Sequence, residues 1–146
     1  MQQADDLKNN VVVDANLFVV MAGNDSRGLL VLERFADWID SGVKIHAPEL
    51  SRYEFANAVP RLIVAGILIQ SDLDEALGKV DVLPVQYHHL SNPKRVIEIS
   101  IMLGRQNAYD AAYLALAEEL SCELWTLDGP LYRNAKGYGF AVNLIS

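Results

Sequence analysis

Short runs of β-branched and other apolar residues alternate along the chain with longer stretches in which apolar residues recur at helical spacing. The short runs predict strands at 11–13, 43–46, 82–87, 123–127 and 140–145. The longer stretches predict helices at 16–21, 29–39, 71–80, 93–103, 108–120 and 131–135, and one that contains 51–59. Strands that alternate with helices pack as a parallel sheet covered on both faces. The sequence therefore predicts an α/β fold, an α/β/α sandwich with a mostly parallel central sheet.

Prolines and amides indicate where several of these helices begin or break. Asn92 followed by Pro93 is typical of an N-cap and a first helical residue, and Asn107 can cap the next helix. Pro48 suits the first turn of the helix after the second strand. Pro60 lacks the amide that a helix interior requires, so we expect it to kink or interrupt that helix.

Composition narrows the class of protein. The 146 residues are 51% hydrophobic and 21% charged, which predicts one globular domain over 1–146 with a polar N-terminal leader at 1–10. A net charge of −7 disfavours a wide basic surface for nucleic acid but leaves room for a small basic rim. The start of the chain has no signal-peptide pattern, and no apolar run approaches the roughly 20 residues of a membrane span. We therefore expect a cytoplasmic protein that does not enter a membrane.

Four acidic residues occupy positions that one edge of the predicted sheet would bring together. Asp14 directly follows the apolar run 11–13, and Asp128 follows the strand predicted at 123–127. Glu54 and Asp110 lie on predicted helices. Each acid also has an ordinary structural role, as a helix cap, in a first helical turn or on a solvated face. Functional groups gather beyond the carboxyl ends of parallel strands, so the four together predict a site there.

The chemistry expected of such a site is metal-assisted hydrolysis. Several carboxylates bind hard divalent ions such as Mg²⁺ and Mn²⁺, and no lysine or arginine lies close in sequence to Asp14 or Asp110. Such an ion can activate a water and offset charge on a phosphodiester. Asn57 and Arg61 follow Glu54 at helical spacing, which makes Arg61 a candidate phosphate contact. The three histidines lie outside these positions, and we expect surface or structural roles for His46, His88 and His89.

Four segments in order, VVVDAN, YEFANAV, YDAAYLALAEEL and LWTLDGPLYRNA, resemble the successive motifs of PIN-domain ribonucleases, and the small format resembles VapC-type toxins. The resemblance implies a Rossmann-like fold and a metal-dependent endoribonuclease that uses Mg²⁺ or Mn²⁺. It implies that Asp14, Glu54 and Asp110 are the central acids, with Asp128 as the fourth and Asn16 and Thr126 in support. It further implies a homodimer that acts on RNA and is silenced by a small antitoxin protein.

Two features depart from the family pattern, and three other classes are alternatives. Gly129 and Pro130 follow the fourth acid where a charged residue is common, and Pro60 interrupts a helix that usually lacks proline. A phosphoacceptor receiver domain would need an aspartate at the end of the third strand, and a haloacid-dehalogenase-type phosphatase would need one at position 16; neither is present. A non-catalytic binding module with the same fold remains the alternative to the nuclease.

Overall fold

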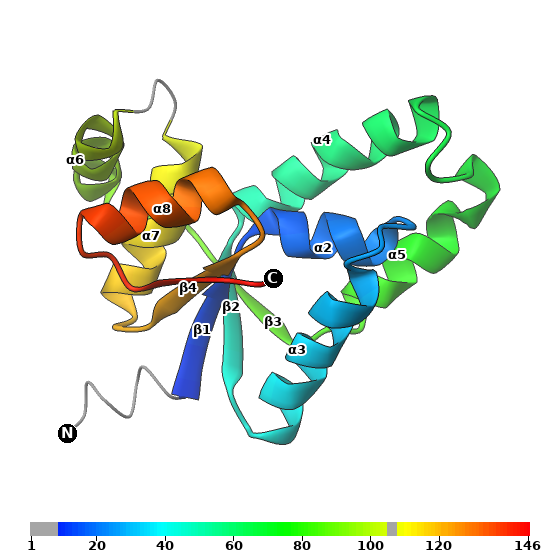
Figure 1. Cartoon of the computed structure of the whole chain (residues 1–146), viewed down its shortest axis with the longest axis horizontal. Helices are drawn as coiled ribbons and strands as arrows, with labels where there is room; N and C mark the ends of the chain where they lie inside the picture. Colours follow the sequence, from blue (N-terminus) through cyan, green and yellow to red (C-terminus); the bar gives the residue numbers. More distant parts are fainter. Residues whose placement is uncertain (1–8, 105–107) are drawn as a thin grey trace.

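The computed structural model describes residues 9–104 and 108–146, and these form a five-stranded sheet in which all strands are parallel (Figure 1). The strand order is β3-β2-β1-β4-β5. The strands are β1 (Asn10–Val13), β2 (Lys44–Pro48), β3 (Val85–His88), β4 (Glu123–Thr126) and β5 (Val142–Leu144). The predicted α/β class is confirmed, and the sheet is more uniform than expected because no strand within the described residues runs antiparallel.

Helices cover both faces of this sheet. The described helices are α2 (Ala15–Ala22), α3 (Gly28–Asp40), α4 (Leu50–Val64), the 3₁₀ turn η1 (Gln70–Asp72), α5 (Leu73–Asp81), α6 (Pro93–Leu103), α7 (Tyr109–Glu119) and α8 (Gly129–Gly137). Helices α2, α3 and α5 lie on one face, and α6, α7 and α8 lie on the other (Figure 1). None of the helices within 9–104 and 108–146 has the length and apolar character needed to cross a membrane.

Strand β1 is buried on both sides because it lies between two hydrophobic cores. Val11 and Val13 point into the core that α2, α3 and α5 cover, and Val12 points into the core beneath α6, α7 and α8. This alternation follows from the two-residue period of a strand. Both faces are apolar, so the strand appears in the sequence as a continuous run of valines.

The chain leaves β1 in one direction toward β2 and β3 and later returns on the other side with β4 and β5. The strand order therefore reverses between β1 and β4, which is the topological switch point of an open parallel sheet. The residues that follow β1, β2 and β4 all emerge at the carboxyl edge of the sheet. Asp14, the start of α4 and Asp128 lie at these three positions.

Several predicted boundaries need correction. Pro48 was expected in the first turn of the following helix, but it is the last residue of β2, and α4 begins at Leu50. Pro60 does not interrupt α4, which continues to Val64. Pro60 and Ala56, whose carbonyl loses its helical partner, are both exposed, so water can satisfy that carbonyl. The third and fifth strands are shorter than predicted, at Val85–His88 and Val142–Leu144.

The helix signals around α6 are confirmed as far as the structure describes them. Asn92 Oδ1 accepts a hydrogen bond from the backbone N–H of Arg95 at 3.1 Å, and Pro93 is the first residue of the helix. Gly104 ends α6 in the left-handed conformation with φ of 70°, which glycine adopts without strain. The cap predicted at Asn107 and most of the leader at 1–10 lie outside the described residues.

Two histidines connect three strands through side-chain hydrogen bonds. His46 on β2 is buried, and its Nδ1 lies 2.9 Å from Nε2 of His88 on β3. Its Nε2 lies 2.8 Å from Oδ1 of Asn10 on β1. Burial, followed by the neighbouring His88 and Lys44, lowers the pKa of His46 to about 4. The imidazole is therefore neutral at physiological pH and serves the sheet as a hydrogen-bonding group.

We predict that Pro60→Ala stabilises the protein by about 1–2 kcal/mol, because it restores a backbone hydrogen bond and removes a steric conflict inside α4. Urea unfolding followed by circular dichroism measures the change. Pro84→Ala is the matched control, since Pro84 is exposed and lies outside any helix. An equal or lower stability for Pro60→Ala would show that the helix already accommodates the proline at no cost.

Candidate active site

A cleft of about 760 Å³ lies at the carboxyl edge of the sheet, and all four predicted acids line it. Asp14 directly follows β1, and Asp128 is the second residue after β4. Glu54 lies on α4, and Asp110 lies in the first turn of α7. Two other predicted residues also line the cleft, namely Asn16 and Arg61. The fold thus brings together residues that are up to 114 positions apart in the sequence, from Asp14 to Asp128.

Asp14 is held by the neighbouring strand. Its backbone N–H donates to the carbonyl of Trp125 at 3.1 Å, and its Oδ2 accepts a hydrogen bond from Thr126 Oγ1 at 2.8 Å. Only 9% of Asp14 is exposed to solvent. The residue stands at the N-cap position of α2, but its side chain makes no capping hydrogen bond. The carboxylate lines the cleft together with Glu54 and Asp110.

Thr126 supports the cleft from behind. Its hydroxyl donates to Asp14 and accepts from the backbone N–H of Asp128 at 3.0 Å and from Asn16 Nδ2 at 3.4 Å. A hydroxyl has one donor and two acceptor positions, so this group is fully satisfied although the residue is completely buried. Thr126 thereby fixes the relative positions of β1, α2 and the segment that carries Asp128.

Burial and neighbouring negative charge raise the pKa values of Asp14 and Glu54. Burial, opposed by the Thr126 hydrogen bond and reinforced by the charges of Glu54 and Asp110, raises the pKa of Asp14 to about 7. Burial also raises the pKa of Glu54, and the charge of Asp110 adds to that effect. Like charges that lie close together in a partly desolvated cleft favour a protonated state or a bound cation.

Tyr113 contacts Glu54 and is a residue to which the sequence assigned no role. It is 1% exposed, and its hydroxyl donates a short hydrogen bond to Glu54 Oε1. This bond lowers the pKa of Glu54 against the effect of burial. Tyr113 follows Asp110 by three residues, so both lie on the inward face of α7, and that spacing is the signal that could have identified it.

Asp128 combines the two roles that the sequence left as alternatives. Its Oδ1 accepts a hydrogen bond from the backbone N–H of Leu131 at 3.0 Å, which makes it the N-cap of α8. It also lines the cleft. Gly129 and Pro130 are the first two residues of α8, where a proline is tolerated because its missing N–H would have no helical partner.

Two arginines line the cleft beside the acids. Arg61 lies on α4, two turns beyond Glu54, whereas Asn57 is exposed and does not contribute to the lining. Arg27 was not predicted, and its guanidinium donates to both carboxylate oxygens of Asp25 at 3.0 and 2.9 Å. Arg27 and Asp25 both line the cleft and neutralise one another, so Arg61 is the basic residue of the described lining that is not paired with Asp25.

The acids match a hard divalent ion in chemistry but do not form a complete cage. Within the described ranges, no group of three or more His, Cys, Asp or Glu side chains is arranged so that it could hold a metal ion. Mg²⁺ retains several waters and is commonly bound through one or two carboxylates and a substrate phosphate. The mutual repulsion of Asp14, Glu54 and Asp110 is what such an ion would relieve.

Comparison with known proteins identifies the family. The profile of the PIN domain matches residues 11–137. The chain belongs to the PIN-domain family. This PIN domain is 35% identical over 121 residues to VapC ribonuclease Mb0985 of Mycobacterium bovis and to ribonuclease VapC9 of Mycobacterium tuberculosis. The aligned region covers 81% of this chain and 85% of each relative, so the resemblance to VapC-type proteins is confirmed.

A solved structure supports the fold of this PIN domain. The crystal structure of PAE2754 from Pyrobaculum aerophilum superposes with a TM-score of 0.67. The two sequences are 23% identical, and the match covers 91% of this chain and 82% of the other. At that identity the likeness establishes the architecture and nothing further about the site.

We predict that Asp14→Asn stabilises the metal-free PIN domain at pH 8 by about 1–3 kcal/mol, since the amide avoids the cost of a buried charge. The folded pKa lies above the ordinary value, so Asp14 favours folding below about pH 4 and opposes it as the pH rises through 7. Urea unfolding in EDTA from pH 4 to pH 8 measures this difference.

The advantage of Asp14→Asn over the wild type should shrink as the pH falls toward 4. Asp74→Asn is the matched control, because Asp74 is exposed in the first turn of α5. If the wild type and Asp14→Asn differ by the same amount at every pH, the carboxyl of Asp14 does not carry the proton that its burial implies.

Proposed function

We propose that this PIN domain is a VapC-type endoribonuclease that uses Mg²⁺ or Mn²⁺ to hydrolyse RNA phosphodiester bonds, and that it acts in the cytoplasm as the toxin of a type II toxin–antitoxin pair. The observation that carries the proposal is the convergence of four carboxylates in one cleft, in a chain whose relatives are named VapC ribonucleases. A scaffold role alone would not require a buried Asp14 close to the charges of Glu54 and Asp110.

The residues of the cleft divide the work. Asp14, Glu54 and Asp110 would hold the ion, with Asp128 beside it and already fixed as a helix cap. When bound, such an ion lowers the pKa of a water and offsets the charge on the attacked phosphate. Thr126 and Tyr113 hold Asp14 and Glu54 in place through their hydroxyl groups. Arg61, which lines the cleft, would contact a flanking phosphate.

The cleft does not supply a histidine base. His46, His88 and His89 are absent from its lining, and His46 is neutral and hydrogen-bonded within the sheet. The proposal therefore assigns no histidine base and relies on the carboxylates and the ion that they would hold. This agrees with the acid-only motifs in the sequence.

The proposal includes three partners. RNA is the substrate, a small antitoxin protein silences the activity, and a second copy of the chain forms a homodimer. The VapC relatives support the first two, and the open reading frame beside this gene is where the antitoxin would be encoded. Ile97 and Ile101, one turn apart on α6 and 56% and 75% exposed, support a contact with a second copy.

We predict that Asp14→Asn and Asp110→Asn each reduce Mn²⁺-dependent cleavage of RNA by at least about 100-fold. Removal of a residue that only supports a metal ligand costs up to about 100-fold, and removal of a ligand itself should cost at least as much. Cleavage of a total RNA preparation with Mg²⁺ or Mn²⁺ measures the activity. Calorimetric titration with Mn²⁺ measures binding of the ion separately.

Asp74→Asn is again the control and should cleave like the wild type. Unchanged cleavage in both Asp14→Asn and Asp110→Asn would remove the nuclease assignment. If the wild type binds no Mn²⁺ at millimolar concentration and cleaves no RNA, the alternative of a non-catalytic PIN-fold binding module is correct.

A further inference from the structure

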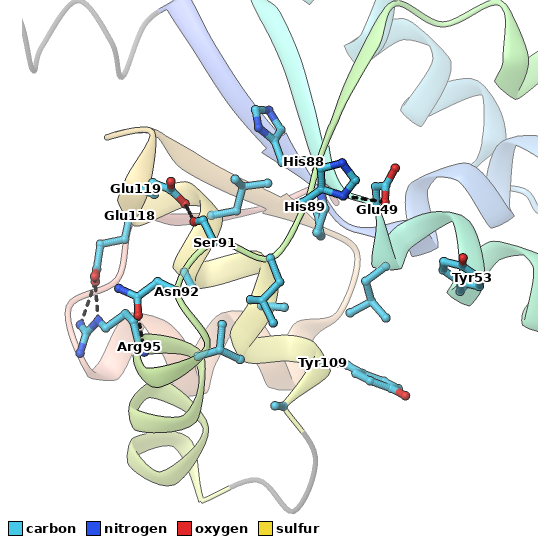
Figure 2. A pocket seen from close by; sticks show the side chains of 18 residues that line it. Glu49, Tyr53, His88, His89, Ser91, Asn92, Arg95, Tyr109, Glu118 and Glu119 are labelled. Atoms are coloured by element: carbon cyan, nitrogen blue, oxygen red, sulfur yellow. Dashed lines mark hydrogen bonds and ion pairs between the residues drawn. The ribbon is translucent and has the colours of Figure 1, made fainter.

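A second cavity of about 660 Å³ adjoins the N-terminal ends of α4 and α7 (Figure 2). Its walls come from the end of β2, the start of α4, the segment after β3, and helices α6 and α7. Most of the surface that faces the cavity is apolar, including Leu50, Leu90, Val96, Ala112 and Leu116. Nothing in the proposed mechanism uses this cavity.

The charged groups around the cavity are paired with one another. His89 Nδ1 lies 3.1 Å from Glu49 Oε2, and Arg95 donates to both oxygens of Glu118 at 2.7 and 2.8 Å (Figure 2). Ser91 donates to Glu119 at 2.8 Å. A phosphate would have to displace the Glu118 carboxylate from Arg95. An uncharged, flat group with a broad apolar face suits this cavity better than an anion does.

Two exposed tyrosines connect this cavity to the acid cleft. Tyr53 is 75% exposed and directly precedes Glu54, and Tyr109 is 54% exposed and directly precedes Asp110. Successive residues on a helix point about 100° apart, so each helix directs an acid to the cleft and a tyrosine to the cavity. Figure 2 shows both phenol rings projecting from the ends of their helices at the same side of the cavity.

We propose that this cavity is a subsite for an unpaired nucleobase of the RNA substrate, next to the phosphodiester that lies over the acids. The inference rests on the proposed ribonuclease function and extends it to the base. Unstacked bases bind proteins by stacking on aromatic side chains, and this requires no charge from the protein. The location fits, because the same two helical turns carry the acids and the tyrosines. Tyr53 and Tyr109 are then binding residues, and the base contact offsets the poor attraction between RNA and a chain of charge −7.

The test measures RNA binding without cleavage. Fluorescence anisotropy in EDTA gives the affinity for labelled oligo(A), oligo(C) and oligo(U), and for an abasic ribose-phosphate strand of the same length. We expect at least one homopolymer to bind more tightly than the abasic strand. Tyr53→Ala and Tyr109→Ala should each weaken that binding by about 10-fold or more, which is typical of a lost base–aromatic stack.

Tyr53→Phe and Tyr109→Phe should retain the affinity, because they keep the ring. Neither alanine variant should alter binding of the abasic strand. Tyr138→Ala is the control, since Tyr138 is also exposed, at 56%, but lies at the end of α8 and lines neither cavity. Homopolymer affinities that are the same for the alanine variants and the wild type would overturn the subsite. The cleavage assay separately decides the nuclease function.

The other possible occupant is a second copy of the chain, and sedimentation equilibrium distinguishes it. If Tyr53→Ala or Tyr109→Ala converts a dimer to monomers while each chain binds RNA as before, the cavity is a subunit interface and the proposal is wrong. Ile101→Glu, on α6 outside the lining, is the second control. If Ile101→Glu both dissociates the dimer and weakens RNA binding as much as the tyrosine variants do, the loss of binding follows from dissociation, and the base subsite is also overturned.

Discussion

The rest of the site depends on the burial of one carboxylate at the end of a central strand. Asp14 cannot move away from the cleft, because β1 lies between two cores and its own backbone N–H continues the ladder to β4. A charge held there is costly unless hydrogen bonds or a cation compensate for it. The hydroxyl of Thr126 provides one hydrogen bond, and the approach of Glu54 and Asp110 adds repulsion. The fold therefore holds Asp14 in an electrostatically unfavourable position, and this makes the binding of a cation there favourable.

The sequence predicted the parts of this arrangement that follow from periodicity. The valines before Asp14 indicate a strand buried on both faces, and a parallel sheet places the residue after such a strand at the functional edge. Contacts between distant segments could not be predicted in this way. The bond from Tyr113 to Glu54 joins residues 59 positions apart, and the two tyrosines beside the cavity gain significance only when α4 and α7 are seen to meet.

Local rules were incomplete at two residues, Pro60 and Asp128. Pro60 was expected to kink or interrupt α4, but the helix continues to Val64, and the carbonyl that loses its partner lies on an exposed turn where water can bind it. Asp128 was treated as either a cap or a site residue, although one carboxylate has two oxygens and can serve in both capacities. The outcome depends on the exposure of one carbonyl in the first case and on the two oxygens of one carboxylate in the second, and neither can be read from residue type alone.

The neutral histidine within the sheet has a consequence for how the molecule responds to acid. Because the pKa of His46 is depressed to about 4, its contribution to stability is complete above about 6.5 and is lost as the pH falls toward 4. Asp14 changes in the opposite sense over nearly the same interval, since protonation relieves its burial. The two groups bind protons with opposing linkage to folding, so their contributions partly cancel between pH 4 and 7. As the pH falls from 7 to 4, the contribution of His46 to the free energy of unfolding decreases and that of Asp14 increases. The net change in stability from these two groups is therefore smaller than the change from either one.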